Sequence, residues 1–223
     1  MENKKIKLST FKVPSLICFS MIILQINNWD SVEIFRLNTN DSLIDAIQGI
    51  LLSPFAHSSN KHLINNVVPL FFLMSLLRYI FDKFSSILFL LLYILTGLFI
   101  WRFIPNHSVI GASGVLYSMI SFLFFSGLIR GNRELLGYSL LIVFLYGGMV
   151  WGMFPFSVAE NVSWEGHLMG FIVGFLLSIL FRKKGPQKKV YDWENDELNN
   201  DDSDNTDKID DDHFTIKYHY SKD

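Results

Sequence analysis

The sequence predicts an all-α membrane protein with six transmembrane helices, and three observations support this fold class. Half of the 223 residues are hydrophobic and 15% are aromatic, a composition typical of membrane proteins. Long apolar stretches recur, most of them near the ~20 residues that cross a ~30 Å hydrocarbon core. The charged residues fall mainly outside these stretches. We therefore expect one bundle of membrane helices over residues 13–182.

Six stretches are predicted to span the membrane. They cover residues 13–26, 63–80, 86–104, 114–129, 135–151 and 167–181. The opening "MENKKIKLSTFK" and the apolar run after it could form a secretory signal peptide, but the following "QINNWDS" offers no small-residue cleavage site. A retained first helix is the better interpretation. Because Cys18 in this helix is the single cysteine, no internal disulfide can form.

The segment 27–61 is predicted to be a long outer loop between the first two spans. Within it, "DSLIDAIQGILLSPF" has the apolar spacing of a helix, with Asp41 as a candidate N-cap. A helix with one apolar face outside the spans is expected to lie along the membrane interface.

Residues 183–223 are predicted to form a cytoplasmic tail that is first basic and then acidic. In "DWENDELNNDDSDNTDKIDDD", 11 of 21 residues are acidic and almost none can contribute to a core. Such a composition is typical of a disordered segment. No patch of basic and aromatic residues indicates nucleic-acid binding.

The basic residues predict the orientation, because Lys and Arg favour the cytoplasmic side of short connections. If six helices alternate, most basic residues near the spans fall on one side. These are Lys4, Lys5, Lys7, Lys12, Arg78, Lys83, Arg130, Arg133, Arg182, Lys183 and Lys184. We therefore expect residues 1–12 and the tail to be cytoplasmic. The second, fourth and sixth spans then begin at the outer side.

A serine and a histidine stand at the beginnings of two of these spans. Ser113 lies in "IGASGV" and is a poor nucleophile unless a base takes its proton, a role for which histidine is the usual residue. His167 opens the sixth span, and Gly170 and Gly174 follow on the same helical face. Small residues permit close helix packing in lipid. We therefore expect Ser113 and His167 to meet, with Tyr117 one turn below the serine packing under the imidazole ring.

Acyl transfer at Ser113 would also need hydrogen-bond donors for an oxyanion. His62 and Asn66 are four residues apart at the start of the second span, so they project from one helical face. Asn65 is an equal candidate on spacing. The backbone amide of Ser113, at a helix N-terminus, could add to them.

These motifs resemble those of the rhomboid family of intramembrane serine proteases, specifically the compact six-helix bacterial form. The matching segments are "HSSNKHLINN", "GASG" and "GHLMGFIVG" at the starts of the second, fourth and sixth spans. The resemblance implies a six-helix rhomboid-like bundle in the bacterial cytoplasmic membrane.

The same resemblance implies roles for individual residues. Ser113 would be the nucleophile and His167 its base, in a dyad without an acidic third member, while His62 and Asn66 stabilise the oxyanion. The aromatic ring that stacks on the histidine would be Tyr117. The glycines Gly111 and Gly114 beside the serine would support close packing. The implied substrates are transmembrane segments of other proteins, with no metal or other cofactor.

Two departures from the family pattern accompany this resemblance. Many rhomboids carry a Trp-Arg pair in the first outer loop, and this chain has none there, while Gly166 stands where an alanine often precedes the histidine.

The alternative function is that of a proteolytically inactive rhomboid-like protein that binds and routes transmembrane clients.

Proteases of other classes need features that are absent from the sequence. A metal-dependent intramembrane protease needs H-E-x-x-H, and an aspartyl one needs two aspartates within the spans. A zinc site from His57, His62 and His167 would have none of the usual ligand spacings.

Overall fold

The structure is a computed structural model that describes residues 6–27, 33–82, 84–156 and 162–188. Within these ranges it is almost entirely helical. The long helices are α1 (Ser9–Ile26), α3 (Asn60–Phe81), α4 (Phe84–Phe103), α5 (Ser113–Arg130), α6 (Arg133–Tyr146) and α7 (Trp164–Leu180). Most of the acidic tail predicted from the sequence lies outside the described residues.

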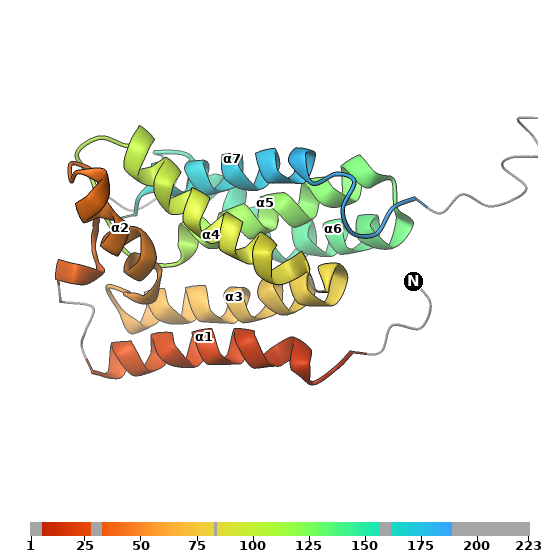
Figure 1. Ribbon diagram of the computed structural model, residues 1–223, viewed down its shortest axis with the longest axis horizontal. Coiled ribbons are helices and arrows are strands. Elements are labelled where there is room, and N and C mark those ends of the chain that lie inside the picture. Colours follow the sequence, from red (N-terminus) through yellow and green to blue (C-terminus); the bar gives the residue numbers. More distant parts are fainter. Residues whose placement is uncertain (1–5, 28–32, 83, 157–161, 189–223) are drawn as a thin grey trace, which may run out of the picture. The chain divides into compact units, whose positions relative to one another are not determined.

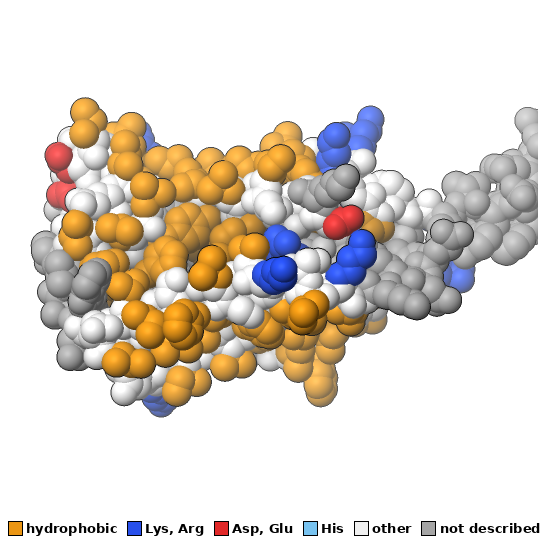
Figure 2. All heavy atoms as spheres, turned by 60° about the horizontal axis from the view of Figure 1, so that its bottom comes forward, with side chains coloured by type: hydrophobic (Ala, Val, Ile, Leu, Met, Phe, Trp, Pro, Cys, Tyr) orange, Lys and Arg blue, Asp and Glu red, His pale blue; other side chains and the backbone are white. Residues whose placement is uncertain are grey.

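The helices correspond one to one with the predicted spans, and the all-α membrane fold is confirmed. Five helical segments among the described residues are long and apolar enough to cross a membrane, α6 being counted together with the 3-10 turn that follows it. The remaining predicted span corresponds to α7, which is apolar but has only 17 residues, so the number of six spans stays a prediction. Hydrophobic side chains cover much of the face in Figure 2, as expected where lipid takes the place of water.

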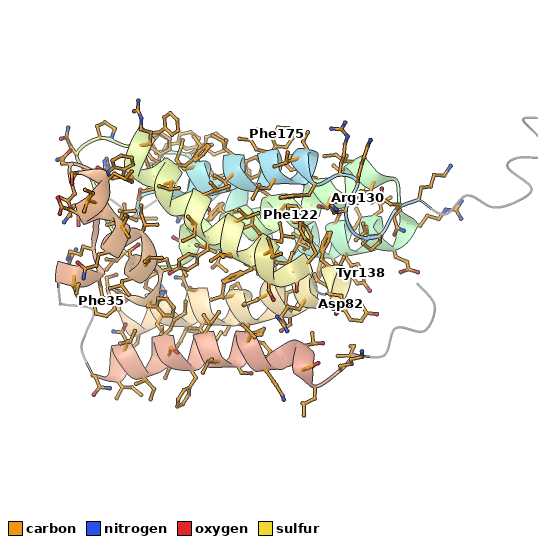
Figure 3. The ribbon with its side chains drawn as sticks, in the orientation of Figure 1. Phe35, Asp82, Phe122, Arg130, Tyr138 and Phe175 are labelled. Atoms are coloured by element: carbon orange, nitrogen blue, oxygen red, sulfur yellow. The ribbon has the colours of Figure 1, made fainter. Side chains whose placement is uncertain are left out.

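The central helix of the bundle is α5, which contacts α3, α4, α6 and α7 (Figure 1). Its buried residues lie on all sides, and Phe122 at its middle is fully buried (Figure 3). In contrast, α1 packs mainly on α3 and exposes large apolar side chains such as Leu16 and Phe19. A helix that is buried all round belongs inside the bundle, where its side chains can be reached from several neighbours.

The close approach of α5 and α7 depends on glycine. A Cβ added at Gly170 would overlap the backbone carbonyl oxygen of Gly114, and one added at Gly174 would overlap that of Ser118. Gly114 in turn lies close to the Gly166 carbonyl. The predicted small-residue face of the last span therefore packs on the helix that begins with Ser113, because only small residues allow backbones to approach this closely.

The far ends of α5 and α7 are also joined. Arg130, at the end of α5, donates hydrogen bonds to the carbonyl oxygens of Phe181 (2.7 Å) and Lys184 (3.1 Å). Its guanidinium lies over the rings of Phe81 and Phe122. A buried cation thus ties the end of α5 to the turn that follows α7, where the Phe181 carbonyl also accepts the Lys184 amide. Figure 3 shows Arg130 at the end of the bundle opposite Phe35.

The loop between α1 and α3 contains ordered structure at the other end. It includes a 3-10 turn η2 (Glu33–Phe35), the strand β1 (Leu37–Asn38), helix α2 (Leu43–Leu52) and a second 3-10 turn η3 (Ser53–Phe55). The sequence analysis did not predict β1, which pairs antiparallel with β2 (Ser108–Val109). Two-residue strands are too short to have a periodic pattern. Through this pairing the loop is fastened to the segment that leads into Ser113.

Two local predictions need correction. The N-cap of α2 is Ser42 rather than Asp41: the Ser42 hydroxyl accepts the Asp45 amide, while the Asp41 carbonyl accepts a hydrogen bond from the Trp101 indole. The predicted helix 135–151 ends as an α-helix at Tyr146 and continues as the 3-10 helix η4 (Gly147–Met153). The glycine pair that begins η4 weakens α-helix formation at this point.

Candidate active site

The structure places Ser113 and His167 within hydrogen-bond distance. Ser113 is the first residue of α5, and His167 lies in the first turn of α7. Their Oγ and Nε2 atoms are 2.9 Å apart. The position of His167 follows from a local cap, because the Ser163 hydroxyl accepts the Gly166 amide and so begins α7 just before the histidine.

The second ring nitrogen of His167 has a backbone partner. Nδ1 lies 2.8 Å from the carbonyl oxygen of Gly152 in η4. A carbonyl oxygen can only accept a hydrogen bond, so Nδ1 carries the hydrogen of the neutral ring. Nε2 is then the acceptor for the Ser113 hydroxyl, which is the tautomer required of a general base.

Tyr117 supports the imidazole from one face. The two rings are stacked with centroids 4.3 Å apart and planes at 11°. The Tyr117 hydroxyl donates a 2.6 Å hydrogen bond to the Met149 carbonyl. Gly152 is confined by this arrangement, since a Cβ there would overlap the Tyr117 hydroxyl. The 3-10 turn therefore contacts both rings through two carbonyl oxygens, those of Met149 and Gly152.

The Gly152 and Met149 carbonyls were missed by the sequence analysis. Every residue has a carbonyl group, so no residue type at these positions could have indicated them. The adjacent Gly147 and Gly148 were the available signal, because paired glycines inside an apolar run predict an interruption of the α-helix.

Gly111 permits the backbone to approach His62. Its φ of +99° is a left-handed conformation that favours glycine. A Cβ at this position would lie 2.7 Å from His62 Cε1 and 2.9 Å from Nε2. The other ring nitrogen of His62, Nδ1, lies 3.2 Å from the Ser58 hydroxyl. His62 is thus placed against the loop that leads into Ser113.

The structure distinguishes Asn66 from Asn65. Asn66 is buried, and its Nδ2 donates a 2.7 Å hydrogen bond to the carbonyl of His62. The amide nitrogen carries a second hydrogen, and Oδ1 is buried without a partner in the described part of the chain. Asn65 is exposed on the neighbouring face of α3.

These groups share a cavity of about 690 Å³. Ser113, His167, His62 and both asparagines line it. Apolar and backbone groups from α4 and the outer loop form much of the remaining wall, including Ile100 and Pro54. A cavity of this size and mixed polarity can hold a short length of polypeptide beside the serine.

His57, which the sequence suggested as a loop-ordering residue besides a conceivable zinc ligand, contacts His62 from outside the set of residues that line the cavity. It is completely buried, and its ring meets that of His62 edge to face, with centroids 5.1 Å apart and an interplanar angle of 76°. The three histidines do not share a metal site, because both nitrogens of His167 face Ser113 and Gly152. Burial lowers the pKa of His57 to about 4, and the His62 ring acts in the same direction, while the Phe55 backbone partly opposes the shift.

This pKa predicts a pH-dependent stability that originates at His57. Between pH 6.5 and about 4 an unfolded histidine binds a proton that the folded one does not, so the free energy of unfolding falls as the pH falls through this window. The slope is at most about 1.4 kcal/mol per pH unit. Thermal unfolding is therefore measured in detergent at pH 7 and at pH 5. The drop in pH should lower the Tm of wild type by a few degrees more than that of His57→Leu. Equal losses in the two proteins would contradict the assignment.

Comparison with known protein families identifies the family of the chain. A family model described as Rhomboid domain matches residues 45–184. The chain belongs to the rhomboid family, whose members are generally intramembrane proteases.

Curated proteins similar in sequence to this chain include mycobacterial ones. Uncharacterized proteins of Mycobacterium bovis and Mycobacterium tuberculosis are each 28% identical over 192 residues, covering 79% of this chain and 77% of the relative. An uncharacterized protein of Mycobacterium leprae is 29% identical over 156 residues, covering 66% of this chain and 60% of the relative. The family and the apolar helices together define a multi-pass membrane protein surrounded by a lipid bilayer.

Proposed function

We propose that this protein is an intramembrane serine endopeptidase that cleaves transmembrane segments of other membrane proteins. The observation that carries the proposal is the hydrogen bond between Ser113 and His167, with the histidine tautomer set by the Gly152 carbonyl. This arrangement supplies a nucleophile and a correctly protonated base at one end of a bundle of membrane helices.

In the proposed first step, His167 Nε2 takes the Ser113 proton as Oγ bonds to the carbonyl carbon of the scissile peptide. The carbonyl oxygen becomes an oxyanion, and His62, Asn66 and the Ser113 backbone amide donate hydrogen bonds to it. The Ser113 amide is available because the first N–H groups of a helix have no partner within the helix. The imidazolium then protonates the leaving amine as the C–N bond breaks.

The second half of the reaction releases the acyl group. Water enters the cavity and loses a proton to His167 as it attacks the acyl carbon, and Ser113 leaves with that proton. In this scheme the Gly152 carbonyl has the orienting role that an acidic residue has in a Ser-His-Asp triad. Tyr117 holds the ring plane through both steps.

The proposed location is a bacterial cytoplasmic membrane, with both termini in the cytoplasm and the dyad near the outer face. The basic residues support this orientation. Arg130, Arg133 and Lys184 belong to the ends of α5, α6 and α7 that lie away from Ser113, and Figure 2 has the larger groups of Lys and Arg side chains toward that end.

A gel-based cleavage assay tests the function. Wild type should cut a reporter protein with one transmembrane helix, and Ser113→Ala should reduce the rate on the order of 10⁴-fold or more, because loss of a nucleophile removes the covalent route. Ser126→Ala is the matched control. Ser126 lies in the same helix, is fully buried, and its hydroxyl has no hydrogen-bond partner among the described residues, so the activity of this variant should match wild type. A wild type that binds the reporter without cutting it would favour the client-binding alternative.

A further inference from the structure

His57 is a buried polar side chain whose ring nitrogens make no hydrogen bond of normal geometry in the described part of the chain. It lies in the short connection between η3 and α3, and its exposed fraction is 0%. The Phe55 backbone acts to raise the pKa of His57 but offsets only part of the effect of burial. Burying unpaired polar atoms destabilises a fold, and an apolar side chain of similar size would avoid this cost. Stability of the connection therefore does not explain why a histidine stands here.

The contact with His62 offers an explanation. The two rings pack edge to face, a favourable geometry for aromatic groups. His62 also meets the Ser58 hydroxyl at Nδ1 and the Gly111 backbone near Cε1 and Nε2. Its ring is therefore confined by three neighbours: a hydroxyl, a glycine in the left-handed region and a second imidazole.

This confinement matters for hydrogen bonding to an oxyanion. When the Ser58 hydroxyl donates to Nδ1, the hydrogen of neutral His62 is on Nε2. Donors of this kind act through preorganisation. If the ring turns so that its Nε2 donor moves by a fraction of an ångström, much of the stabilisation of the oxyanion is lost. In that tautomer the Ser58 hydrogen bond lies at one ring atom and does not by itself stop the ring from tilting. The edge-to-face contact with the His57 ring adds a restraint on the plane.

We propose that His57 is a positioning residue that holds the His62 ring in the plane required for donation to the oxyanion. The proposal rests on the proposed protease function. It assigns His57 no contact with substrate and no proton transfer. What His57 contributes is the shape and edge of an aromatic ring in a fully enclosed position, so phenylalanine should replace it better than leucine.

The test is a double-mutant cycle with His62 in the reporter cleavage assay. His57→Leu should lower kcat by about 10-fold or more and leave KM within about twofold, since the donor is misplaced while the cavity stays intact. In a His62→Ala background, the same substitution should change kcat by less than about twofold, because the ring on which His57 acts is gone. His57→Phe should restore most of the activity that His57→Leu loses.

Controls separate this proposal from simpler explanations. His107→Leu, which changes an exposed loop histidine, should leave kcat within about twofold of its parent, whether that parent is wild type or His62→Ala. Each variant is checked for monodispersity in detergent, and if His57→Leu does not fold, His57→Gln, which also lacks the ring, goes through the same cycle. Equal fold-losses with and without His62 would overturn the positioning role. A wild type that cleaves nothing would overturn the protease function itself, and the positioning role with it.

Discussion

Replacing His167 with alanine is expected to abolish labelling of Ser113 by a fluorescent fluorophosphonate. The probe reacts with an activated serine hydroxyl, and Ser113 Oγ lies 2.9 Å from His167 Nε2, the proposed base. Without that acceptor the hydroxyl keeps its proton and is a poor nucleophile. We expect labelling to fall by on the order of 10³-fold or more, to the level of Ser113→Ala.

The matched control for this experiment is His107→Ala. The His107 side chain is exposed and contacts the Pro105 carbonyl and, at 3.6 Å, the Glu165 carboxylate. Its hydrogen bonds with Thr39 involve the backbone, which alanine keeps, so the substitution should have little effect on the dyad. Labelling is followed by in-gel fluorescence, and the labelled residue is identified by mass spectrometry. Persistent labelling of Ser113 in His167→Ala would mean that another group is the base.

Replacing Gly170 with leucine is expected to reduce proteolysis by about 10²-fold or more although Ser113 and His167 themselves are chemically unchanged. Even a single Cβ atom at Gly170 would overlap the carbonyl oxygen of Gly114, which is the residue after Ser113. A leucine therefore separates α7 from α5 and moves His167 away from the serine. Displacements near 1 Å can cost about 10²-fold in rate even when no reacting group is removed.

A glycine elsewhere in the bundle provides the comparison. Gly137 in α6 has open space where a Cβ would stand, so Gly137→Leu should retain near-normal turnover. Both variants are purified, checked for monodispersity in detergent and assayed against the reporter substrate. If monodisperse Gly170→Leu turned over at the wild-type rate, the packing of α5 on α7 would not be what aligns Ser113 with His167.

The positions of the spans could be read from the sequence because length and apolarity are local properties. The run that became α5 is apolar over a membrane-spanning length, and Gly131, in the left-handed region, follows its last residue. The rhomboid family was likewise predicted from short motifs around Ser113 and His167 and is confirmed. The N-cap of α2 was placed one residue too early because Asp41 and Ser42 are both good capping residues.

The pairing of Ser113 with His167 rested on topology and on a small-residue spacing. Helix starts that alternate across a membrane bring every second one to the same side. Gly170 and Gly174 at helical spacing then indicated which face of the last span approaches a neighbour. These are regular, residue-specific signals, and they remained readable although Ser113 and His167 are 54 positions apart.

By itself, then, the sequence determined which residue types were available for the site and at which helix ends they stand, because these follow from local spacing and hydrophobicity. The tertiary structure decided the rest. It alone brought the Gly152 carbonyl to the second nitrogen of His167, buried Asn66 rather than Asn65 and set His57 against His62. The physical reason is that backbone carbonyls have no residue-specific signature, and burial depends on which neighbouring segments pack against a position.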